Sequence, residues 1–484
     1  MKPKPCFLTG LFLLKWAMVF RSDFRKINDY LWEIPKTFRQ DMRVPARIYA
    51  SEKMLQDILG DKSVFQLING TTLPGIVKYG IAMPDCHQGY GVPIGFVGAI
   101  RASDGVISPG ACGFDINCGM RLLKTEYKEE EIIFYLEKLA VEIQNQVPSG
   151  LGKGRRIKMN IREIDRILEQ GPDFLFKKGY GEKGDIENCE AKGKLDWADV
   201  LAVSDRAKNR ARDQVGTLGS GNHFLEIQKV AEIFDKETAE KFGLFENQIV
   251  IMIHTGSRGL GHQVCSDYLK TMASAMEKYG IKAPDKEFAY VPFSSKEGMR
   301  YFSAMAGAAN YAWCNRHMIA HYVRQAFRLV LGKRTKLSLL YDVAHNIIKK
   351  ENYEVSGKDT ELLVHRKGAV RAFPGQPVLI PGSMGTFSYI LMGTEKGKEA
   401  FFSSSHGAGR RMSRREAMRV ISGKKVIEEL KKKRIIVKCR SLRGIAEEAP
   451  LTYKDIDRVV EVVHRAGLSL KVARLVPLAV VKGE

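Results

Sequence analysis

This sequence predicts a mixed α/β fold (α+β) in a single large interwoven domain. Apolar, strand-like runs separated by glycine-rich turns alternate with longer stretches of helical periodicity. We find no internal repeat and no stretch with the composition of a linker. The 484 residues, of which 44% are hydrophobic and 27% are charged, are sufficient for a globular domain with a substantial core.

Local patterning predicts the elements of the first half. We expect a polar segment at 29–45, a helix at 51–59, short strands joined by glycine turns over 81–123, and an amphipathic helix at 129–146. Residues 147–197 are rich in charge and glycine, so we expect a mobile insertion near the substrate surface. A glycine turn and a strand follow over 216–228, and the apolar run at 247–254 predicts a buried strand.

The second half continues the alternation. We expect a long helix at 303–331, a buried strand with a polar end at 337–345, and a strand-rich region over 364–390. The tail predicts helices at 413–421, 424–433 and 453–466, with strands at 435–439 and 471–480. We therefore place the whole of 18–484 in one domain.

The first residues stand apart from this domain. Two lysines precede an apolar run at 6–14, as in a short signal peptide, but Lys15 and Trp16 interrupt it and no small-residue cleavage site follows. The run is also too short to cross a bilayer. We expect translation to begin at Met18, with residues 1–17 forming a disordered or misassigned extension, and we expect no association with a membrane.

The charge balance favours a polyanionic partner. Lysine and arginine outnumber aspartate and glutamate by 77 to 55, a formal net charge of +22. Basic residues cluster at 153–158, 410–415 and 431–434. Nucleic acid is the commonest partner of such surfaces, although a basic proteome or a thermophilic surface would give the same surplus.

The eight cysteines are scattered without paired spacing. Several lie within apolar or glycine-rich stretches, which indicates reduced thiols in a cytoplasmic protein. Because the sequence contains no CxxC pair, a structural zinc ribbon or finger is not expected.

Polar side chains follow strand-like runs or glycine turns at four places. These are Asp115 with Cys118, Asn222 with His223, His254 with its following turn, and His345 with Asn346. Such strand ends commonly converge on one site in α/β folds. One thiolate, three imidazoles and one carboxylate suffice for two divalent ions if the thiolate bridges them. Sulfur and nitrogen suit zinc, whereas the carboxylate also allows manganese or iron. The alternative for each histidine is a hydrogen-bonded core residue.

His406 lies in a loop of small residues and is a candidate nucleophile. Small neighbours let a ligand approach the imidazole closely. Arg410 and Arg414 follow at a spacing that suits phosphate oxygens, and Ser413 with Glu416 predicts the start of a helix. The alternative is a surface loop that leads into a solvated basic helix.

Asp85 is a candidate partner for this histidine. A carboxylate can accept the Nδ1 proton of a catalytic histidine and leave Nε2 free to attack, although a turn aspartate that caps backbone amides is the alternative. The sequence has neither a GxxxxGK[ST] phosphate loop nor a Lys-x-Asp-Gly motif. If the enzyme activates a phosphate with a nucleotide, a residue other than lysine must carry that nucleotide.

Together these stretches resemble the RtcB family of RNA ligases, the GTP- and manganese-dependent enzymes that join 2′,3′-cyclic phosphate or 3′-phosphate ends to 5′-hydroxyl ends in tRNA splicing and RNA repair. The resemblance rests on PDxHQGYG at 84–91, GFDINCG at 113–119, GTLGSGNHF at 216–224, HTGSRG at 254–259, YDVAHN at 341–346, PGSMG at 381–385 and SHGAGR at 405–410. It covers the chain from about residue 18 to its end.

The resemblance implies a role for each matching residue. The implied ligands of two manganese ions, with Cys118 bridging, are Asp115, Cys118, His223, His254 and His345. His406 is the implied acceptor of GMP, and Asp85 its orienting partner. The implied nucleotide contacts are Asn222, Phe224, Glu226, Ser383, Ser388, Gly407, Ala408, Gly409, Arg410, Tyr453 and Lys482, with Arg258 and Arg414 as further anion contacts. The departures from the family pattern are Thr255, Cys86, Cys112 and Phe387, the last of which would tighten the pocket.

The resemblance also implies an archease-like activating partner, and we expect a cytoplasmic monomer that acts on RNA. Two other classes stay open. One is a metal-dependent phosphoesterase that acts on RNA ends with the same ligands and without nucleotide transfer. The other is a basic RNA-binding module whose histidines and cysteines are structural. A covalent GMP adduct would separate the ligase from both.

Overall fold

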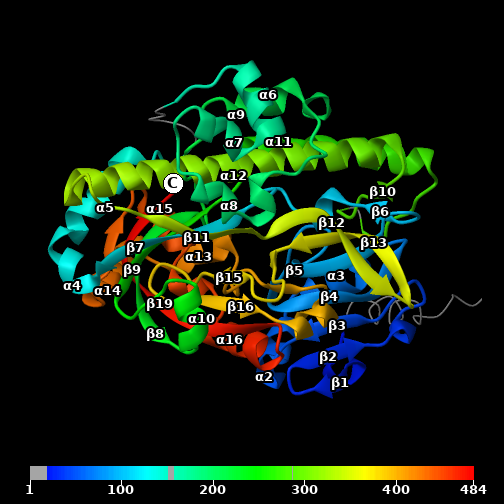
Figure 1. Cartoon of the computed structure of the whole chain (residues 1–484). Coiled ribbons are helices and arrows are strands. Elements are labelled where there is room, and N and C mark those ends of the chain that lie inside the picture. Colours follow the sequence, from blue (N-terminus) through cyan, green and yellow to red (C-terminus); the bar gives the residue numbers. More distant parts are fainter. Residues whose placement is uncertain (1–18, 151–156, 286, 484) are drawn as a thin grey trace, which may run out of the picture.

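The computed structural model describes residues 19–150, 157–285 and 287–483. Two large, mostly antiparallel sheets lie beneath one long helix, α12, which runs across the upper part of the view in Figure 1. This arrangement confirms the mixed α/β fold that the sequence predicts. The expectation for residues 1–17 falls outside the described residues. Within the described residues, no helix is both long and apolar enough to cross a membrane.

The first sheet has seven strands. In spatial order they are β1 (Arg25–Asn28), β2 (Leu31–Ile34), β3 (Ala46–Tyr49), β4 (Ile76–His87), β5 (Ile94–Arg101), β13 (Lys358–Lys367) and β12 (Asn346–Val355). All neighbours pair antiparallel except β3 and β4, which are parallel. A small ribbon of β14 (Ala369–Arg371) and β17 (Ser403–Ser405) follows this sheet in the chain.

The second sheet supplies most of the candidate metal ligands. Its strands are β11 (Ser338–Ala344), β7 (Gly119–Lys128), β9 (Gln248–Thr255), β8 (Phe224–Ile233), β19 (Ser469–Lys482), β16 (Ser388–Gly393) and β15 (Pro377–Ile380), with β18 (Ile436–Lys438) pairing parallel to β19. A separate ribbon pairs β6 (Val106–Ile107) with β10 (Val291–Pro292). β11 and β12 belong to different sheets, so the chain passes from one sheet to the other at the residue between them, His345.

Helices cover both sheets. They are α2 (Glu52–Leu59), α3 (Ser63–Gly70), α4 (Glu129–Ile132), α5 (Leu136–Gln146), α6 (Ile161–Gln170), α7 (Pro172–Lys177), α8 (Gly184–Glu187), α9 (Asp205–Ala211), α10 (Lys236–Lys241), α11 (Arg258–Lys278), α12 (Lys296–Leu331), α13 (Arg414–Val420), α14 (Gly423–Lys432), α15 (Leu442–Glu447) and α16 (Ile456–Arg465). Short 3₁₀ helices lie at η1 (Arg21–Asp23), η2 (Lys36–Phe38), η3 (Pro109–Ala111), η4 (Ile133–Tyr135), η5 (Glu190–Gly193), η6 (Val200–Ala202), η7 (Glu395–Ala400) and η8 (Pro450–Thr452).

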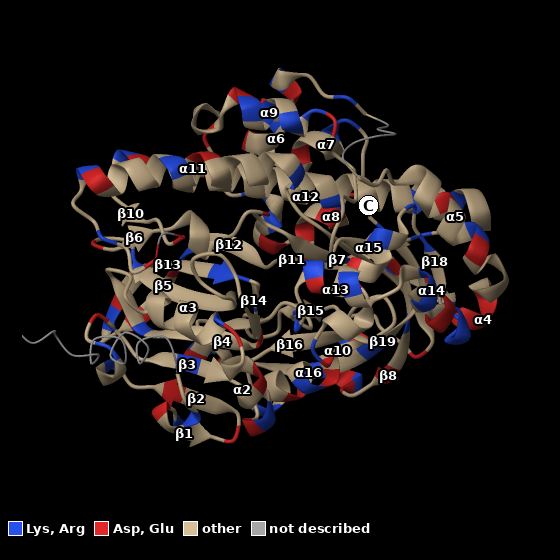
Figure 2. Ribbon diagram, turned by 180° about the vertical axis from the view of Figure 1, so that it is seen from behind, with Lys and Arg blue, Asp and Glu red and all other residues tan. Residues whose placement is uncertain are grey.

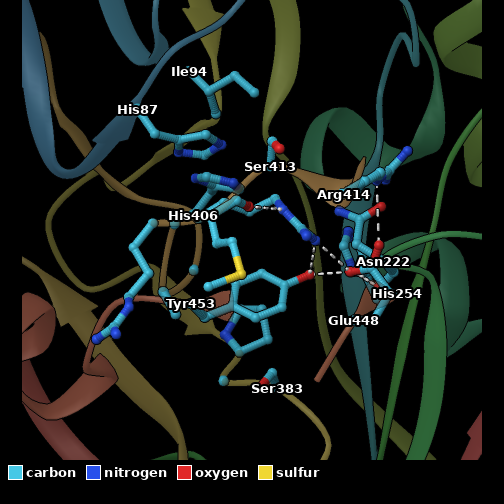
Figure 3. Close-up of a pocket in the computed structure, with 18 of the residues that line it drawn as sticks. His87, Ile94, Asn222, His254, Ser383, His406, Ser413, Arg414, Glu448 and Tyr453 are labelled. Carbon is cyan, nitrogen blue, oxygen red and sulfur yellow. Dashed lines mark hydrogen bonds and ion pairs between the residues drawn. The ribbon is translucent and has the colours of Figure 1, made fainter. Parts of the chain in front are cut away.

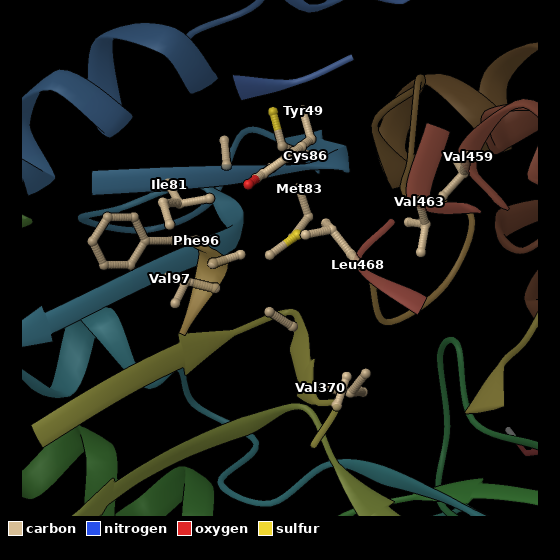
Figure 4. Packing of buried hydrophobic residues seen from close by; sticks show 14 of the residues in the cluster. Tyr49, Ile81, Met83, Cys86, Phe96, Val97, Val370, Val459, Val463 and Leu468 are labelled. Carbon is tan, nitrogen blue, oxygen red and sulfur yellow. The ribbon is translucent and has the colours of Figure 1, made fainter. Parts of the chain in front are cut away.

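The second sheet lies between two hydrophobic cores. Along β9, Val250 and Met252 pack into the core that β4, β5 and α16 share, whereas Ile251 and Ile253 pack into the core beneath α11 and α12. Side chains alternate between the two faces of a strand, so a strand buried on both faces reads as one continuous apolar run. Figure 4 shows the first core, where Val459 and Val463 of α16 approach β4.

Two predictions for the N-terminal half are wrong. Residues 29–45 include β2, whose Trp32 is fully buried and donates a hydrogen bond from Nε1 to the Ala50 carbonyl oxygen over 2.9 Å. The supposed mobile insertion forms α6, α7 and α8 in its described part, 157–197. Ile164, Ile167, Leu168 and Leu175 of this segment are buried in the core beneath α12. Most charges of the segment lie on the other side of these short helices, whereas Asp185 and Glu190 are buried and paired with Arg324 and Lys349. The helix at 129–146 is confirmed, although η4 interrupts it.

Candidate active site and metal centre

Four neighbouring strands of the second sheet bring the candidate metal ligands to one edge. Cys118 and His223 directly precede β7 and β8, His254 is the penultimate residue of β9, and His345 directly follows β11. The strands pair antiparallel in the order β11, β7, β9, β8, so the starts of two lie beside the ends of the other two. Convergence of strand ends was predicted, but here an antiparallel sheet produces it.

The converged side chains form two groups that share one thiol. One group is Cys118, His254 and His345, and the other is Asp115, Cys118 and His223; in each group the potential ligand atoms lie within 4.8 Å of one another. Cys118 Sγ lies 3.2 Å from His254 Nε2 and 3.5 Å from His223 Nε2. A shared sulfur between imidazoles and a carboxylate is a donor set that fits two adjacent transition-metal ions.

The surroundings of the three histidines in this centre favour their neutral form, which is the form that binds metals. Burial lowers the pKa values of His223, His254 and His345, the last two well below the ordinary histidine value. His223 Nδ1 lies 3.0 Å from the carbonyl oxygen of Leu218, and His254 Nδ1 lies 3.1 Å from that of Asn222. A carbonyl oxygen only accepts, so each Nδ1 carries a proton, and in the neutral ring Nε2 is the atom that can bind a metal. His223 Nε2 lies 2.9 Å from Asp115 Oδ2, so these two potential ligand atoms face each other.

Two further observations fit a bound cation. His345 Nδ1 is buried without a hydrogen-bond partner among the described residues. Burial, with the Asp115 carboxylate adding to it, raises the pKa of the Cys118 thiol well above its usual value. A positive ion at this position is what would hold that sulfur as a thiolate.

A buried arginine of α12 holds the ligand-bearing segments in place. Arg316 Nη1 donates to the carbonyl oxygens of Asn117 over 2.7 Å and Thr255 over 2.9 Å, which are the neighbours of Cys118 and His254 in the chain. Its Nη2 donates to Asp342 Oδ1 over 2.8 Å and to Asn117 Oδ1 over 2.9 Å. Asn117 has a left-handed backbone conformation with φ of 52°, which these contacts maintain.

His406 and Asp85 form the predicted pair. Asp85 Oδ2 accepts from His406 Nδ1 over 2.6 Å, from the His406 backbone N–H over 2.9 Å, and from that of Gly407 over 3.3 Å. Burial raises the pKa of the Asp85 carboxyl, but the His406 charge and these hydrogen bonds outweigh it and lower the pKa overall. The proton therefore sits on Nδ1, and His406 Nε2 is free to act as a nucleophile. The His406 ring packs edge-on against His345, with centroids 4.9 Å apart.

The His406 side chain lines a cavity of about 630 Å³. Figure 3 shows Tyr453 between His406 and Ser383, with Arg414, Asn222 and His254 along one side. The predicted residues that line the cavity are Asn222, Phe224, His254, Ser383, His406, Gly407, Ala408, Gly409, Arg410, Arg414, Tyr453 and Lys482. Gly409 has φ of 72°, and a Cβ there would stand 2.0 Å from the Asp85 carbonyl oxygen, so glycine is required.

Other predicted residues lie behind the cavity wall. Gln228 Nε2 donates to Glu226 Oε2 over 2.6 Å and to Ser388 Oγ over 3.0 Å, so these two predicted contacts belong to a layer beneath the lining. Burial raises the pKa of Glu226 to about 7. Arg258 is also buried, donating to Thr217 and to the Gly150 carbonyl oxygen. Phe387 does not line the cavity as expected but packs under the Arg474 guanidinium, 4.5 Å from its ring centroid.

Sequence reasoning missed Glu448, which is 1% exposed and lies in the cavity wall. Its carboxylate pairs with Arg410 over 3.0 Å and with Arg414 over 3.3 Å, and it accepts a short hydrogen bond from the Tyr453 hydroxyl. It thereby orients the two arginines and the aromatic ring that face the cavity. His87 and Asp61 also line the cavity without having been singled out as its residues.

Lys482 shows how the last strand reaches the site. Its Nζ donates to the carbonyl oxygens of Gly221 over 2.9 Å and His223 over 3.2 Å, which fixes the turn before β8. Arg410, Arg411 and Arg414 line the cavity, and Figure 2 shows further Lys and Arg on α13. Arg411, Arg415 and Arg419 on and next to α13 are exposed. A polyanion could approach the cavity along this surface.

Known proteins match nearly the whole chain. A family model described as "tRNA-splicing ligase RtcB" matches residues 66–483. The tRNA-splicing ligase RtcB of Thermococcus kodakarensis is 49% identical over 476 residues, and that of Archaeoglobus fulgidus is 50% identical over 476 residues; each alignment covers 95% of this chain and 98% of the relative. The RNA-splicing ligase RtcB of Mycobacterium tuberculosis is 47% identical over 434 residues, which cover 86% of this chain and all of the relative.

The shared thiol predicts a joint loss of both ions. Replacing Cys118 by alanine removes the one donor common to both groups, so we expect the variant to lose binding of divalent metal at both groups rather than at one. Elemental analysis after equilibration with Mn²⁺ and gel filtration measures this. The control is Cys314→Ala, a buried cysteine of α12 outside both groups, which should keep the full metal content. A Cys118→Ala protein that retains one ion contradicts the shared role.

The buried ion cluster predicts a large loss of stability. Asp342→Asn leaves the fully buried Arg121 and Arg316 without their carboxylate, and removing one partner of such a cluster costs about 3–5 kcal/mol in the free energy of unfolding. Urea denaturation followed by circular dichroism measures the change. Asp359→Asn, at an exposed position of β13, should change the free energy by less than about 0.5 kcal/mol. If Asp342→Asn lowers the free energy of unfolding as little as Asp359→Asn does, the buried ion cluster does not stabilise the protein.

Proposed function

We propose, since this chain belongs to the RtcB family of tRNA-splicing ligases, that it is an RNA ligase that joins RNA ends in tRNA splicing and RNA repair. In finer detail, we propose that it joins a 2′,3′-cyclic phosphate or 3′-phosphate end to a 5′-hydroxyl end at the expense of GTP. The observation that carries this proposal is the oriented His406–Asp85 pair, which stands between a nucleotide-sized cavity and a cluster of metal-binding side chains.

His406 is the proposed carrier of the nucleotide. Its Nε2 attacks the α-phosphorus of GTP, a phosphorus–nitrogen bond forms, and pyrophosphate leaves. Asp85 holds the proton on Nδ1 and stabilises the positive charge that develops on the ring. An oxygen of the RNA 3′-phosphate then attacks the same phosphorus, and the bond to His406 breaks. In the last step the 5′-hydroxyl attacks the RNA phosphorus, its proton is released, and GMP leaves.

Charge neutralisation is the main catalytic requirement of these steps. Two divalent cations, Mn²⁺ in our proposal, would be held by Asp115, Cys118, His223, His254 and His345 and would supply that neutralisation along the phosphate oxygens. The cationic side chains that line the cavity, Arg410, Arg414 and Lys482, add to it. Tyr453 and Phe224 offer aromatic surfaces for the guanine, and Ser383 a hydroxyl for its edge.

The positive charge of the protein supports RNA as the substrate. The net charge of +22 and the exposed arginines near the cavity mouth suit RNA, whose binding should weaken as salt increases. We further propose that the enzyme acts as a cytoplasmic monomer with an archease-like activating protein. The relatives that match the chain are named as ligases, which favours a ligase over an RNA-end phosphoesterase. A structural RNA-binding module would have no use for a His406 imidazole oriented by a buried carboxylate.

The proposed nucleophile predicts a covalent adduct. Incubation with α-labelled GTP and Mn²⁺ followed by a denaturing gel should label the wild-type chain. His406→Ala should abolish the label, because among the described residues no second imidazole is hydrogen-bonded to the Asp85 carboxylate. His464→Ala, on α16 away from the cavity, is the matched control and should remain labelled. Full labelling of the His406→Ala protein would disprove the assignment.

The orienting carboxylate predicts a slower first step. Asp85→Asn keeps the size of the side chain but removes its charge, so we expect adduct formation to slow by about a hundredfold or more while GTP still binds. Quench-flow measurement of the labelled adduct gives the rate, and equilibrium binding of GTP provides the control. An unchanged rate would mean that Asp85 only shapes the loop.

A further inference from the structure

Three aromatic side chains next to the metal centre have no role in the proposed chemistry so far. Tyr90 and Phe114 contact edge to face with ring centroids 5.5 Å apart, and Phe114 stacks on His262 at 6.2 Å with 27° between the planes. Tyr90 and Phe114 are only half-buried, and His262 is exposed. We call these three residues the aromatic platform. Aromatic rings that core packing leaves accessible are the usual stacking surfaces for unpaired RNA bases.

The platform borders the second group of ligands. Phe114 directly precedes Asp115, and His262 lies one turn beyond Arg258 on α11. The loop before Tyr90 is continuous with the cavity, since His87, Gln88 and Gly89 line that cavity. The platform therefore adjoins the active centre without lining the cavity.

The platform adjoins the ligand group whose members, Asp115, Cys118 and His223, do not line the nucleotide cavity. His406 packs on His345, which belongs to the first ligand group, and His254 of that group lines the cavity. Asp115, adjoining the platform, belongs to the second group and does not line the cavity. Transfer of a phosphoryl group requires the attacking and leaving oxygens to lie roughly in line. If GMP leaves toward the cavity, the 5′-hydroxyl must arrive from the far side.

We propose that the aromatic platform binds the base of the first nucleotide of the 5′-hydroxyl RNA strand by stacking. This inference rests on the proposed ligase function and adds a subsite to it. Phe114 and His262 form a near-parallel pair of rings, so a flat base that stacks on His262 continues this stack. Stacking tolerates all four bases, which suits an enzyme that joins ends of different sequence.

The test uses His262→Leu and Phe114→Leu in the full-length enzyme with a separate 5′-hydroxyl RNA strand. Stacking energies predict that KM for this strand rises by about fivefold to a hundredfold in each variant. Covalent GMP on His406 and its transfer to a 3′-phosphate RNA should keep wild-type rates, because neither step uses the 5′-hydroxyl strand. His262→Phe, which keeps an aromatic ring, should restore KM.

A substrate change separates stacking from a structural effect. A 5′-hydroxyl strand with an abasic first nucleotide should raise KM for the wild-type enzyme by the same factor, and should remove the difference between wild type and His262→Leu. Phe134→Leu, at an aromatic residue of η4 that is 91% exposed, is the matched control and should change nothing.

Two results would overturn the inference. One is an unchanged KM in both platform variants, and the other is a KM for the abasic strand that equals that of the normal strand in wild type. Failure of the proposed function itself is recognised separately, since the wild-type enzyme would then form no covalent GMP and join no RNA.

Discussion

The position of the metal-binding side chains depends on one buried ionic contact, the pair of Arg316 and Asp342. Both side chains have no exposed surface, and Arg121 shares the same carboxylate over 2.7 Å. Burying these charges costs several kcal/mol per ion, and the cost is offset only where geometry and hydrogen bonding are complete. Arg316 meets this condition by donating to backbone on both sides of the centre. Its contacts tie α12, β11 and the loops of Cys118 and His254 into one rigid unit.

This rigidity explains how ligands from distant parts of the chain form a preorganised centre. The antiparallel order of β11, β7, β9 and β8 brings two strand starts and two strand ends to one edge. His345 is the residue between β11 of the second sheet and β12 of the first, so the ligand set lies where the chain passes directly from one sheet to the other. The first sheet contributes Asp85 from β4, and the ribbon after it contributes His406. The proposed nucleophile and the candidate metal ligands thus come from different layers and meet at one interface.

Sequence patterns predicted most of what local physics determines. The apolar run of β9 and the Ser413 cap of α13 are where the sequence places them, because periodicity and capping are short-range properties. The gathering of His223, His254 and His345 was predicted because each lies at the end of a strand-like run or a glycine turn. Glu448 was not predicted, since its contacts with Arg410 and Tyr453 arise only when the C-terminal segment folds against the His406 loop.

The remaining errors have similar causes. The four-residue strands β1 and β2 are too short for alternation to stand out. Between 157 and 197, charges on the outer faces of short helices hide the apolar residues that pack beneath α12. Glu226 and Ser388 lie one layer behind the cavity lining, a distinction that spacing along the chain does not contain.

Anomalous diffraction at the manganese edge, from crystals grown with Mn²⁺ and GTP, tests the central claim most directly. We expect two anomalous peaks that both lie within bonding distance of Cys118 Sγ, and continuous density from His406 Nε2 to a phosphorus atom. Peaks that do not share this sulfur, or a His406 ring without attached density beside a bound nucleotide, would contradict it.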